Sequence, residues 1–431
     1  NGNFNIILNP KLTIGLTFNA SYTKQRVNNS IESGFGHGSG GYGIAGNIIQ
    51  QALWFAPIIP VYTANGDYGQ YMQGEFAPYF PKGYANPVAN LKETHDLYSR
   101  NNMTGRLYLN YEIIKDLSLN TSFGGRLNSY YRDWHVSPYL AGTSSPYANF
   151  SNPIYQNIRA GQENGMSNSW TAETYLDYNH IFGNVHDINF IVGYSMEYNG
   201  SRSTSSTASS NNRGTANAAN PIPAFDNYFR PNIYGAALIL GGGGFGENAF
   251  QSIFSRLNYS YKDKYLLMGS IRRDGSSKFA PDNRWGIFPA ISGGWRISKE
   301  PFMENSTWID ELKLRASYGV SGNDQFGNYA WQGKVSYGNL YTYGDPDSGG
   351  SGTGKALIPS SIENRNLKWE VNEQFDFGTD ISIFGERINL SADYFIRKTK
   401  DMLLYRSLPL ENGITSSLFD NIGNMVNKGI E

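Results

Sequence analysis

The chain has 431 residues, enough for two or three ordinary domains or one very large domain. Its formal net charge of -1 argues against a nucleic-acid partner, because nucleic-acid-binding proteins usually carry a strong basic excess. Cysteine is absent, which excludes disulfides, thiolate catalysis and cysteine-bound metals.

Charged residues make up 16% of the chain, below the roughly 25% that is usual for soluble domains. Aromatic residues reach 15%, and the 31 tyrosines among them suit places where a side chain has one apolar end and one wet end. No apolar run approaches the ~18 residues of a membrane helix. This excludes a helical membrane protein, but a transmembrane β-barrel stays open because its apolar residues occupy alternate positions.

Apolar residues recur at every second position in several segments. In residues 188–198, for example, Ile188, Phe190 and Val192 begin a row of apolar side chains on one face. The segments are residues 12–22, 104–113, 117–127, 188–198, 250–262 and 388–396. A two-residue period predicts strands, and the expected lengths of ~10–15 residues match tilted strands that cross a bilayer.

The connections between these segments alternate in length. Short polar turns are expected at residues 9–11, 115–116, 182–184, 262–264 and 385–387. Long segments rich in Gly, Ser, Asn, Pro and Tyr are expected as loops at residues 27–101, 133–168, 201–246 and 324–366. Short turns at one rim and long loops at the other are typical of an outer-membrane barrel. We predict an all-β fold, a transmembrane antiparallel β-barrel with about a dozen strands in this chain.

A glycine cluster offers a competing interpretation. Gly241, Gly243 and Gly246 spell G-x-G-x-x-G, and Asp263 follows about twenty residues later, as in a dinucleotide-binding fingerprint. That fingerprint works between a strand and a helix, whereas residues 250–262 alternate as a strand and contain poor helix formers. We interpret the cluster as a flexible loop that closes just before this strand.

A second glycine-rich stretch, GGSGTGKA at residues 349–356, fits G-x-x-x-x-G-K. Ala356 stands where a phosphate-binding loop needs Ser or Thr for magnesium, and also where a calcium loop needs its bidentate acid. The five histidines show no metal-ligand spacing, and no nucleophile elbow is present. We therefore predict no catalytic residue, no metal site and no cofactor, and expect that the protein is not an enzyme.

Aromatic residues gather in the expected loops. Trp54, Tyr62, Tyr68 and Tyr71 crowd one loop, and Trp134 stands near the start of another. Aromatic faces stack on sugar rings or peptide side chains, but they also pack loops together, which is the commoner role. Contact of these five residues with a substrate or a partner is a hypothesis.

The segment from Ile253 to Ile297 reads IFSRLNYSYKDKYLLMGSIRRDGSSKFAPDNRWGIFPAISGGWRI. Further motifs follow in order: LKLRASYGVSGN at residues 312–323, NLKWEVNEQFDFGTDI at 366–381, DYFIRKTKDMLL at 393–404 and NIGNMVNKGIE at 421–431. Together they resemble the barrel of SusC-type TonB-dependent importers of Bacteroidetes outer membranes. The resemblance covers the chain from about residue 253 to its end, while the earlier part agrees in strand rhythm alone.

The resemblance implies a 22-stranded barrel with an N-terminal plug, set in the lipid of the bacterial outer membrane. It implies active import of oligosaccharides or oligopeptides, energised by TonB through an N-terminal region and assisted by a SusD-like surface lipoprotein. The chain starts NGNFNIILNP without a signal peptide, so we expect residues 1–431 to be one portion of a single barrel domain, with the plug and the C-terminal strands outside it. The alternatives are a passive porin or surface adhesin without energy coupling, and a soluble β-rich enzyme.

Overall fold

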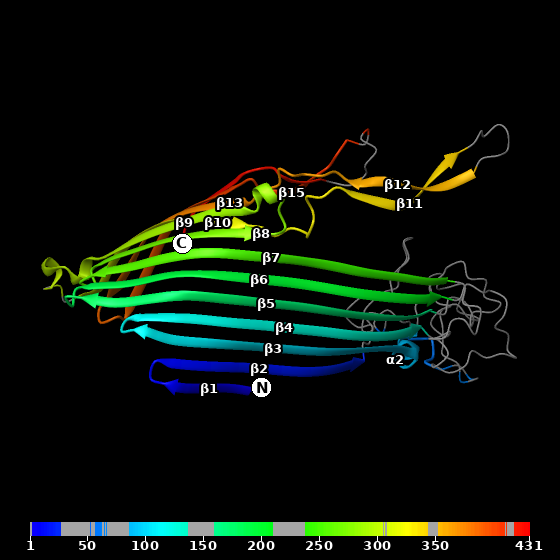
Figure 1. The fold of residues 1–431 in the computed structure, drawn as a ribbon, viewed down its shortest axis with the longest axis horizontal. Coiled ribbons are helices and arrows are strands. Elements are labelled where there is room, and N and C mark those ends of the chain that lie inside the picture. The colour runs from blue at the N-terminus through cyan, green and yellow to red at the C-terminus, as the bar shows by residue number, and fades with distance from the viewer. Residues whose placement is uncertain are drawn as a thin grey trace.

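The structure is a computed structural model. It describes residues 2–26, 57–62, 86–136, 159–209, 238–304, 308–343, 352–409 and 418–431, together with positions 52, 64, 66, 306 and 411. One antiparallel sheet of 13 strands dominates this part of the chain (Figure 1). Among the described residues, no helix has the length and apolar character needed to cross a membrane.

The strands of the main sheet follow one another in chain order. They are β1 (Gly2–Asn9), β2 (Leu12–Arg26), β3 (Thr94–Ile114), β4 (Leu117–Val136), β5 (Arg159–Phe182), β6 (His186–Ser209), β7 (Leu238–Tyr261), β8 (Tyr265–Ser276), β9 (Trp285–Arg296), β10 (Ile309–Asn323), β13 (Glu370–Ile383), β14 (Ile388–Lys400) and β17 (Met425–Ile430). Among the residues that the structure describes, two hairpins lie outside the sheet: β11 (Lys334–Tyr343) with β12 (Gly352–Ser361), and β15 (Leu403–Arg406) with β16 (Leu418–Asn421). Helical elements in the described part of the chain include α2 (Pro87–Glu93) and the 3-10 turns Pro281–Asn283, Ile297–Lys299 and Pro301–Met303.

The pairing register gives the sheet two unlike faces, because directly opposed residues project to the same side. Leu16 lies opposite Leu107, and Leu107 lies opposite Phe123. These three side chains are 43%, 51% and 52% exposed. The same face continues across later strands, for example where Phe190 lies opposite Leu257. We call this side the apolar face; its large exposed apolar area marks a surface that contacts something other than water.

The opposite side, the polar face, carries hydrogen-bonded amides and carboxylates. Asn189 donates from Nδ2 to Asp177 Oδ1 at 2.7 Å, and Asn258 donates to Asn189 Oδ1 at 3.1 Å. Side chains from β5, β6 and β7 are thereby joined across the sheet. The unlike faces of these strands confirm the alternation that the sequence predicted.

The two rims of the sheet also differ. At the turn rim, most neighbouring strands are joined by a few residues, and several of these have left-handed backbones, including Asp116 (φ 70°), Asn184 (φ 58°) and Gly385 (φ 68°). Asp, Asn and Gly tolerate this conformation, which tight hairpin turns require. The loop rim, at the other ends of the strands, carries α2 and the β11–β12 hairpin (Figure 1). The predicted short turns are confirmed.

The strands are longer than predicted. β5, β6 and β7 have 24 residues each, so each is about 80 Å long at about 3.3 Å per residue. An apolar band about 25 Å tall needs far less, even with a tilt of about 45°. The alternating signal ends with the apolar band, whereas backbone pairing continues through polar residues toward the loop rim. For this reason the predicted loops at residues 27–101, 133–168 and 201–246 are too long, since β3, β5, β6 and β7 extend into them, and residues 324–366 contain β11 and β12.

The glycine cluster is not the flexible loop that the sequence predicted. Gly241, Gly243 and Gly246 lie inside β7, paired along their length with β6, so they neither close a loop nor open a helix. A Cβ atom on Gly243 would lie 2.9 Å from the carbonyl oxygen of Ser203. Close approach of two strand backbones therefore explains a glycine here without any nucleotide.

A small hydrophobic core sits at the loop rim. Phe279 and Leu367 are fully buried, and Phe288 and Trp369 are nearly so; we call these four residues the rim core. Trp369 Nε1 donates to the carbonyl oxygen of Arg284 at 3.1 Å. The rim core joins the β8–β9 connection to the segment before β13, which are two of the stretches that carry the family resemblance.

Candidate functional site

Aromatic and charged side chains gather on the polar face of β3, β4 and β5, close to the loop rim. The register places them in three rows: Asp96, Trp134 and Gly161; Tyr98, Arg132 and Glu163; Arg100, Tyr130 and Gly165. We call these nine residues the arginine–tyrosine wall. The wall lies toward the loop-rim end of the apolar band, where Ser129 and Asp133 interrupt the apolar residues Leu97, Tyr131 and Met166 on the apolar face.

Arg132 is the fixed centre of the wall. Its Nε donates to Asp96 Oδ1 at 2.8 Å and its Nη2 donates to Asp96 Oδ2 at 2.7 Å, a two-pronged pairing that sets the plane of the guanidinium. Asp96 is fully buried, whereas the Arg132 side chain keeps 22% of its surface exposed. Glu163 Oε2 lies 3.6 Å from Arg132 Nη1. The guanidinium is therefore held in place while part of it faces the open side of the sheet.

The rings of the wall lie flat on glycines of the next strand. A Cβ atom on Gly161 would lie 2.6 Å from the Trp134 ring, and Tyr130 covers Gly165 in the same way. Tyr130 also stacks on Tyr98, with 5.5 Å between ring centroids. Glycine is needed at both positions because any side chain there would lift the ring. The outcome is a set of flat aromatic surfaces beside a fixed cation.

Arg100 completes this surface. Its Nη2 donates to the Tyr98 hydroxyl at 2.9 Å, and its guanidinium carbon lies 5.1 Å from the centroid of the Tyr98 ring. Aromatic faces bind the apolar faces of sugar rings or flat peptide side chains, and arginine forks bind carboxylates and other oxygen acceptors. The wall therefore combines flat aromatic surfaces with arginine groups that can bind such partners. Within the described ranges, no group of His, Asp and Glu is arranged to hold a metal ion.

The structure describes two of the five aromatic residues that the sequence suggested as contacts for a substrate or partner, and these two lie apart. Trp134 belongs to the wall. Tyr62 lies elsewhere, where its hydroxyl accepts a hydrogen bond from Lys92 Nζ at 2.8 Å next to the end of α2. Trp54, Tyr68 and Tyr71 lie outside the described residues, so their predicted role stays a prediction.

Sequence reasoning missed Arg132 and its acidic partners. The signal was present: Tyr130, Arg132 and Trp134 stand at alternate positions, and all three belong to β4. The predicted loop begins at residue 133, and this boundary separates Trp134 from the strand that carries Tyr130 and Arg132. The partners Asp96 and Glu163 are brought to Arg132 by strand pairing, which sequence spacing does not show.

A second feature of the polar face is a groove of about 440 Å³ between β6 and β13, on the half of the sheet nearer the turn rim. Asn258, Ser292, Lys313 and Arg315 are among its lining residues. Arg315 bonds Asp393 Oδ2 at 2.5 Å, and its Nε lies 3.2 Å from Asp380 Oδ2. This groove offers paired charges and hydroxyls to whatever occupies the polar side of the sheet.

The turn rim is held by a cluster of ions. Asp263, between β7 and β8, bonds Lys299 and also accepts from Arg296 Nη1 at 2.6 Å. The hydrogen bond from Lys299 is the main cause that lowers the pKa of Asp263. Glu300 accepts from the Tyr265 hydroxyl at 2.7 Å, the main cause that lowers its own pKa. Both carboxylates are thus stabilised in their charged form, and they tie the β9–β10 connection to neighbouring strands.

A broad antiparallel sheet with one apolar face, one polar face, short turns and long loops is the wall of an outer-membrane β-barrel. The family described as TonB dependent receptor-like, beta-barrel matches residues 59–431, and the chain belongs to this family. Its members are receptors for transport and are not enzymes, and they reside in the outer membrane.

Curated relatives agree with this assignment. The chain is 31% identical over 439 residues to TonB-dependent receptor P3 of Formosa agariphila, which covers 100% of this chain and 39% of that protein. It is 27% identical over 441 residues to TonB-dependent receptor SusC of Bacteroides thetaiotaomicron, covering 98% of this chain and 40% of SusC. The chain therefore spans well under half the length of these relatives.

Solved structures share the fold. The RagAB peptide transporter matches with a TM-score of 0.70 and 23% identity over 99% of this chain and 43% of that chain. The RagAB peptide importer in the "open-open" state matches with a TM-score of 0.72 and 22% identity, covering 99% of this chain and 42% of that chain.

Proposed function

We propose that the chain forms part of the barrel of a SusC-like importer that takes up oligosaccharides or oligopeptides through the outer membrane. The observation that carries the ligand half of this proposal is the arginine–tyrosine wall, which presents flat rings and a fixed cation toward the loop-rim end of the apolar band. The RagAB neighbour, named as a peptide transporter, supports the peptide class, and the resemblance of the sequence motifs to SusC-type importers supports the oligosaccharide class.

The partners follow from the same proposal. A plug domain would lie against the polar face, where the groove beside Arg315 offers paired charges. TonB would supply the energy, and a SusD-like surface lipoprotein would hold the ligand at the loop rim. The remaining strands of a 22-stranded barrel would close the sheet, because β1 and β17 pair on one side only within the described part.

The wall is tested by substituting its rings in the full-length protein. Trp134→Ala removes a flat surface, so we expect about tenfold weaker ligand binding, equivalent to about 1.4 kcal/mol. Gly161→Ala should weaken binding in the same direction, because its Cβ displaces the Trp134 ring. Gly124→Ala is the matched control: it lies on the same face of β4, and its Cβ would meet nothing closer than a backbone oxygen at 3.7 Å.

Calorimetry with oligosaccharide and peptide pools measures the binding and separates the two ligand classes. Unchanged affinity in both Trp134→Ala and Gly161→Ala would refute a ligand role for the wall. Uptake that continues after the TonB contact is deleted would instead support the passive porin or adhesin alternative.

A further inference from the structure

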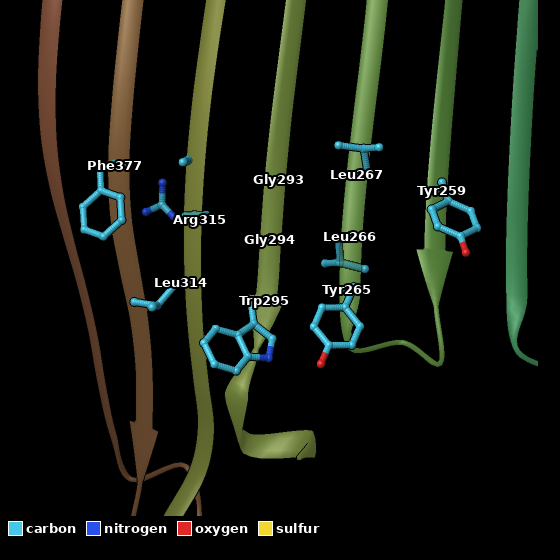
Figure 2. Close-up of a pocket in the computed structure, with 11 residues that line it drawn as sticks. Tyr259, Tyr265, Leu266, Leu267, Gly293, Gly294, Trp295, Leu314, Arg315 and Phe377 are labelled. Carbon is cyan, nitrogen blue, oxygen red and sulfur yellow. The ribbon is translucent and has the colours of Figure 1, made fainter.

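The apolar face carries a groove whose lining is suited to one class of ligand. One row of opposed residues crosses five strands: Tyr259, Leu267, Gly293, Ala316 and Phe377. The two smallest, Gly293 and Ala316, stand between Leu267 and Phe377. The resulting groove has a volume of about 510 Å³ and is lined almost entirely by carbon (Figure 2).

Aromatic residues close the groove toward the turn rim. Figure 2 shows Tyr265 and Trp295 side by side at this end, on β8 and β9. Both rings turn their polar atoms to Glu300 Oε1, at 2.7 Å from the Tyr265 hydroxyl and 3.1 Å from Trp295 Nε1. Tyrosine and tryptophan take this position where hydrocarbon meets the lipid headgroups. The groove therefore begins at headgroup level and runs into the apolar band.

A cation stands at the same level. Lys262 Nζ lies 5.4 Å from the centroid of the Tyr261 ring, and Tyr261 stacks on Tyr265 at 6.3 Å. The neighbouring cations Lys264 and Lys299 bond Glu300 and Asp263. Lys262 has no carboxylate partner among the described residues, so its ammonium is available to an anionic group beside the groove.

We propose that this groove is a binding site for a membrane phospholipid, with one acyl chain over Gly293 and Ala316 and the headgroup phosphate at Lys262. The face is continuous with the lipid-contacting surface of the barrel, which supplies hydrocarbon as the occupant. The turn rim of such barrels faces the periplasm, so the adjoining leaflet consists of phospholipid. The site is independent of the imported ligand.

The test uses the full-length protein extracted from outer membranes in mild detergent, with retained phospholipid counted by native mass spectrometry. Gly293→Leu should fill the groove without strain, because its Cβ would lie 3.9 Å from the nearest atom, a backbone oxygen. We expect at least a fivefold loss of retained phospholipid. Gly125→Leu is the matched control on the apolar face of β4, where the corresponding distance is 3.8 Å, and it should retain phospholipid as the unaltered protein does.

Two further variants test the same site. Ala316→Val narrows the groove from β10, so this variant tests the phospholipid site if Gly293→Leu does not fold. Lys262→Gln should lower retention of anionic phospholipid about threefold, whereas Lys115→Gln, in the β3–β4 turn of the same rim, should not. Equal phospholipid retention in Gly293→Leu and Gly125→Leu would overturn the proposed site. A retained lipid without phosphate would also overturn it, as would a changed oligomeric state with unchanged lipid content. Ligand binding should stay intact in all these variants, which separates this test from that of the wall.

Discussion

At the scale of single residues, glycines on the polar face make room for side chains from neighbouring strands. Gly378 is the clearest case. A Cβ atom there would lie 2.8 Å from the guanidinium carbon of Arg315, and it would also run into the Asp393 carboxylate. A residue without a side chain lets the cation rest over the backbone of β13 while it binds Asp380 and Asp393.

This contact predicts the effect of a single methyl group. Gly378→Ala should destabilise the barrel by about 1–3 kcal/mol, because the methyl group forces Arg315 away from its two acids. Urea unfolding in detergent micelles, followed by tryptophan fluorescence, measures the change. Gly269→Ala has nothing within 4 Å of its new methyl group and should be neutral. Equal stability of the two variants would contradict the packing argument.

At the scale of elements, the rim core organises the loop rim. Leu367 belongs to the segment before β13, Phe279 to the β8–β9 connection, and Phe419, from β16, packs against the same core. Asn364 Nδ2 donates to the Phe419 carbonyl oxygen at 2.9 Å. Segments far apart in the sequence are thus held together by a few buried side chains.

Removing the centre of that core should loosen these elements together. Leu367→Ala deletes a fully buried side chain and should cost about 2–5 kcal/mol, since a cavity remains in place of the side chain. We expect faster cleavage of the β8–β9 and β15–β16 connections in limited proteolysis, while the turn rim stays protected. Val335→Ala, on a side chain that is 69% exposed, is the control. Unchanged cleavage in Leu367→Ala would show that the loops are held elsewhere.

Prediction of elements from sequence worked where one face of a strand is apolar. In β6 the alternation from Ile188 to Tyr198 identified the strand, its faces and its turn. It did not identify the extension to Ser209, since both faces there are polar and pairing alone maintains the strand. The same limit hid the wall, because Tyr130, Arg132 and Trp134 lie in such an extension of β4.

At the scale of the whole molecule, the apolar face requires a hydrocarbon environment. Many of its large side chains are close to half exposed, including Phe18 (48%), Leu107 (51%) and Ile271 (53%). Burying a side chain of this size is worth about 1.5–3 kcal/mol. Summed over the 13-stranded sheet, this free energy of burial favours contact of the apolar face with lipid or detergent.

The protein should therefore leave membranes only with detergent and aggregate when detergent is removed. Size-exclusion chromatography with and without detergent measures this. A monodisperse detergent-free monomer would contradict the membrane assignment and favour a soluble β-rich protein.

The sequence by itself determined the alternation of apolar and polar side chains, the short turns and the motifs of the family, because each of these is encoded within a few neighbouring residues. Only the tertiary structure decided what lies side by side across strands. Asp96, Arg132 and Glu163 meet through the register of β3, β4 and β5, and Gly293 meets Ala316 through that of β9 and β10. The glycine cluster shows the same division: its spacing matched a nucleotide fingerprint, whereas pairing with β6 placed it inside a strand, since hydrogen bonding between distant segments decides a residue's surroundings.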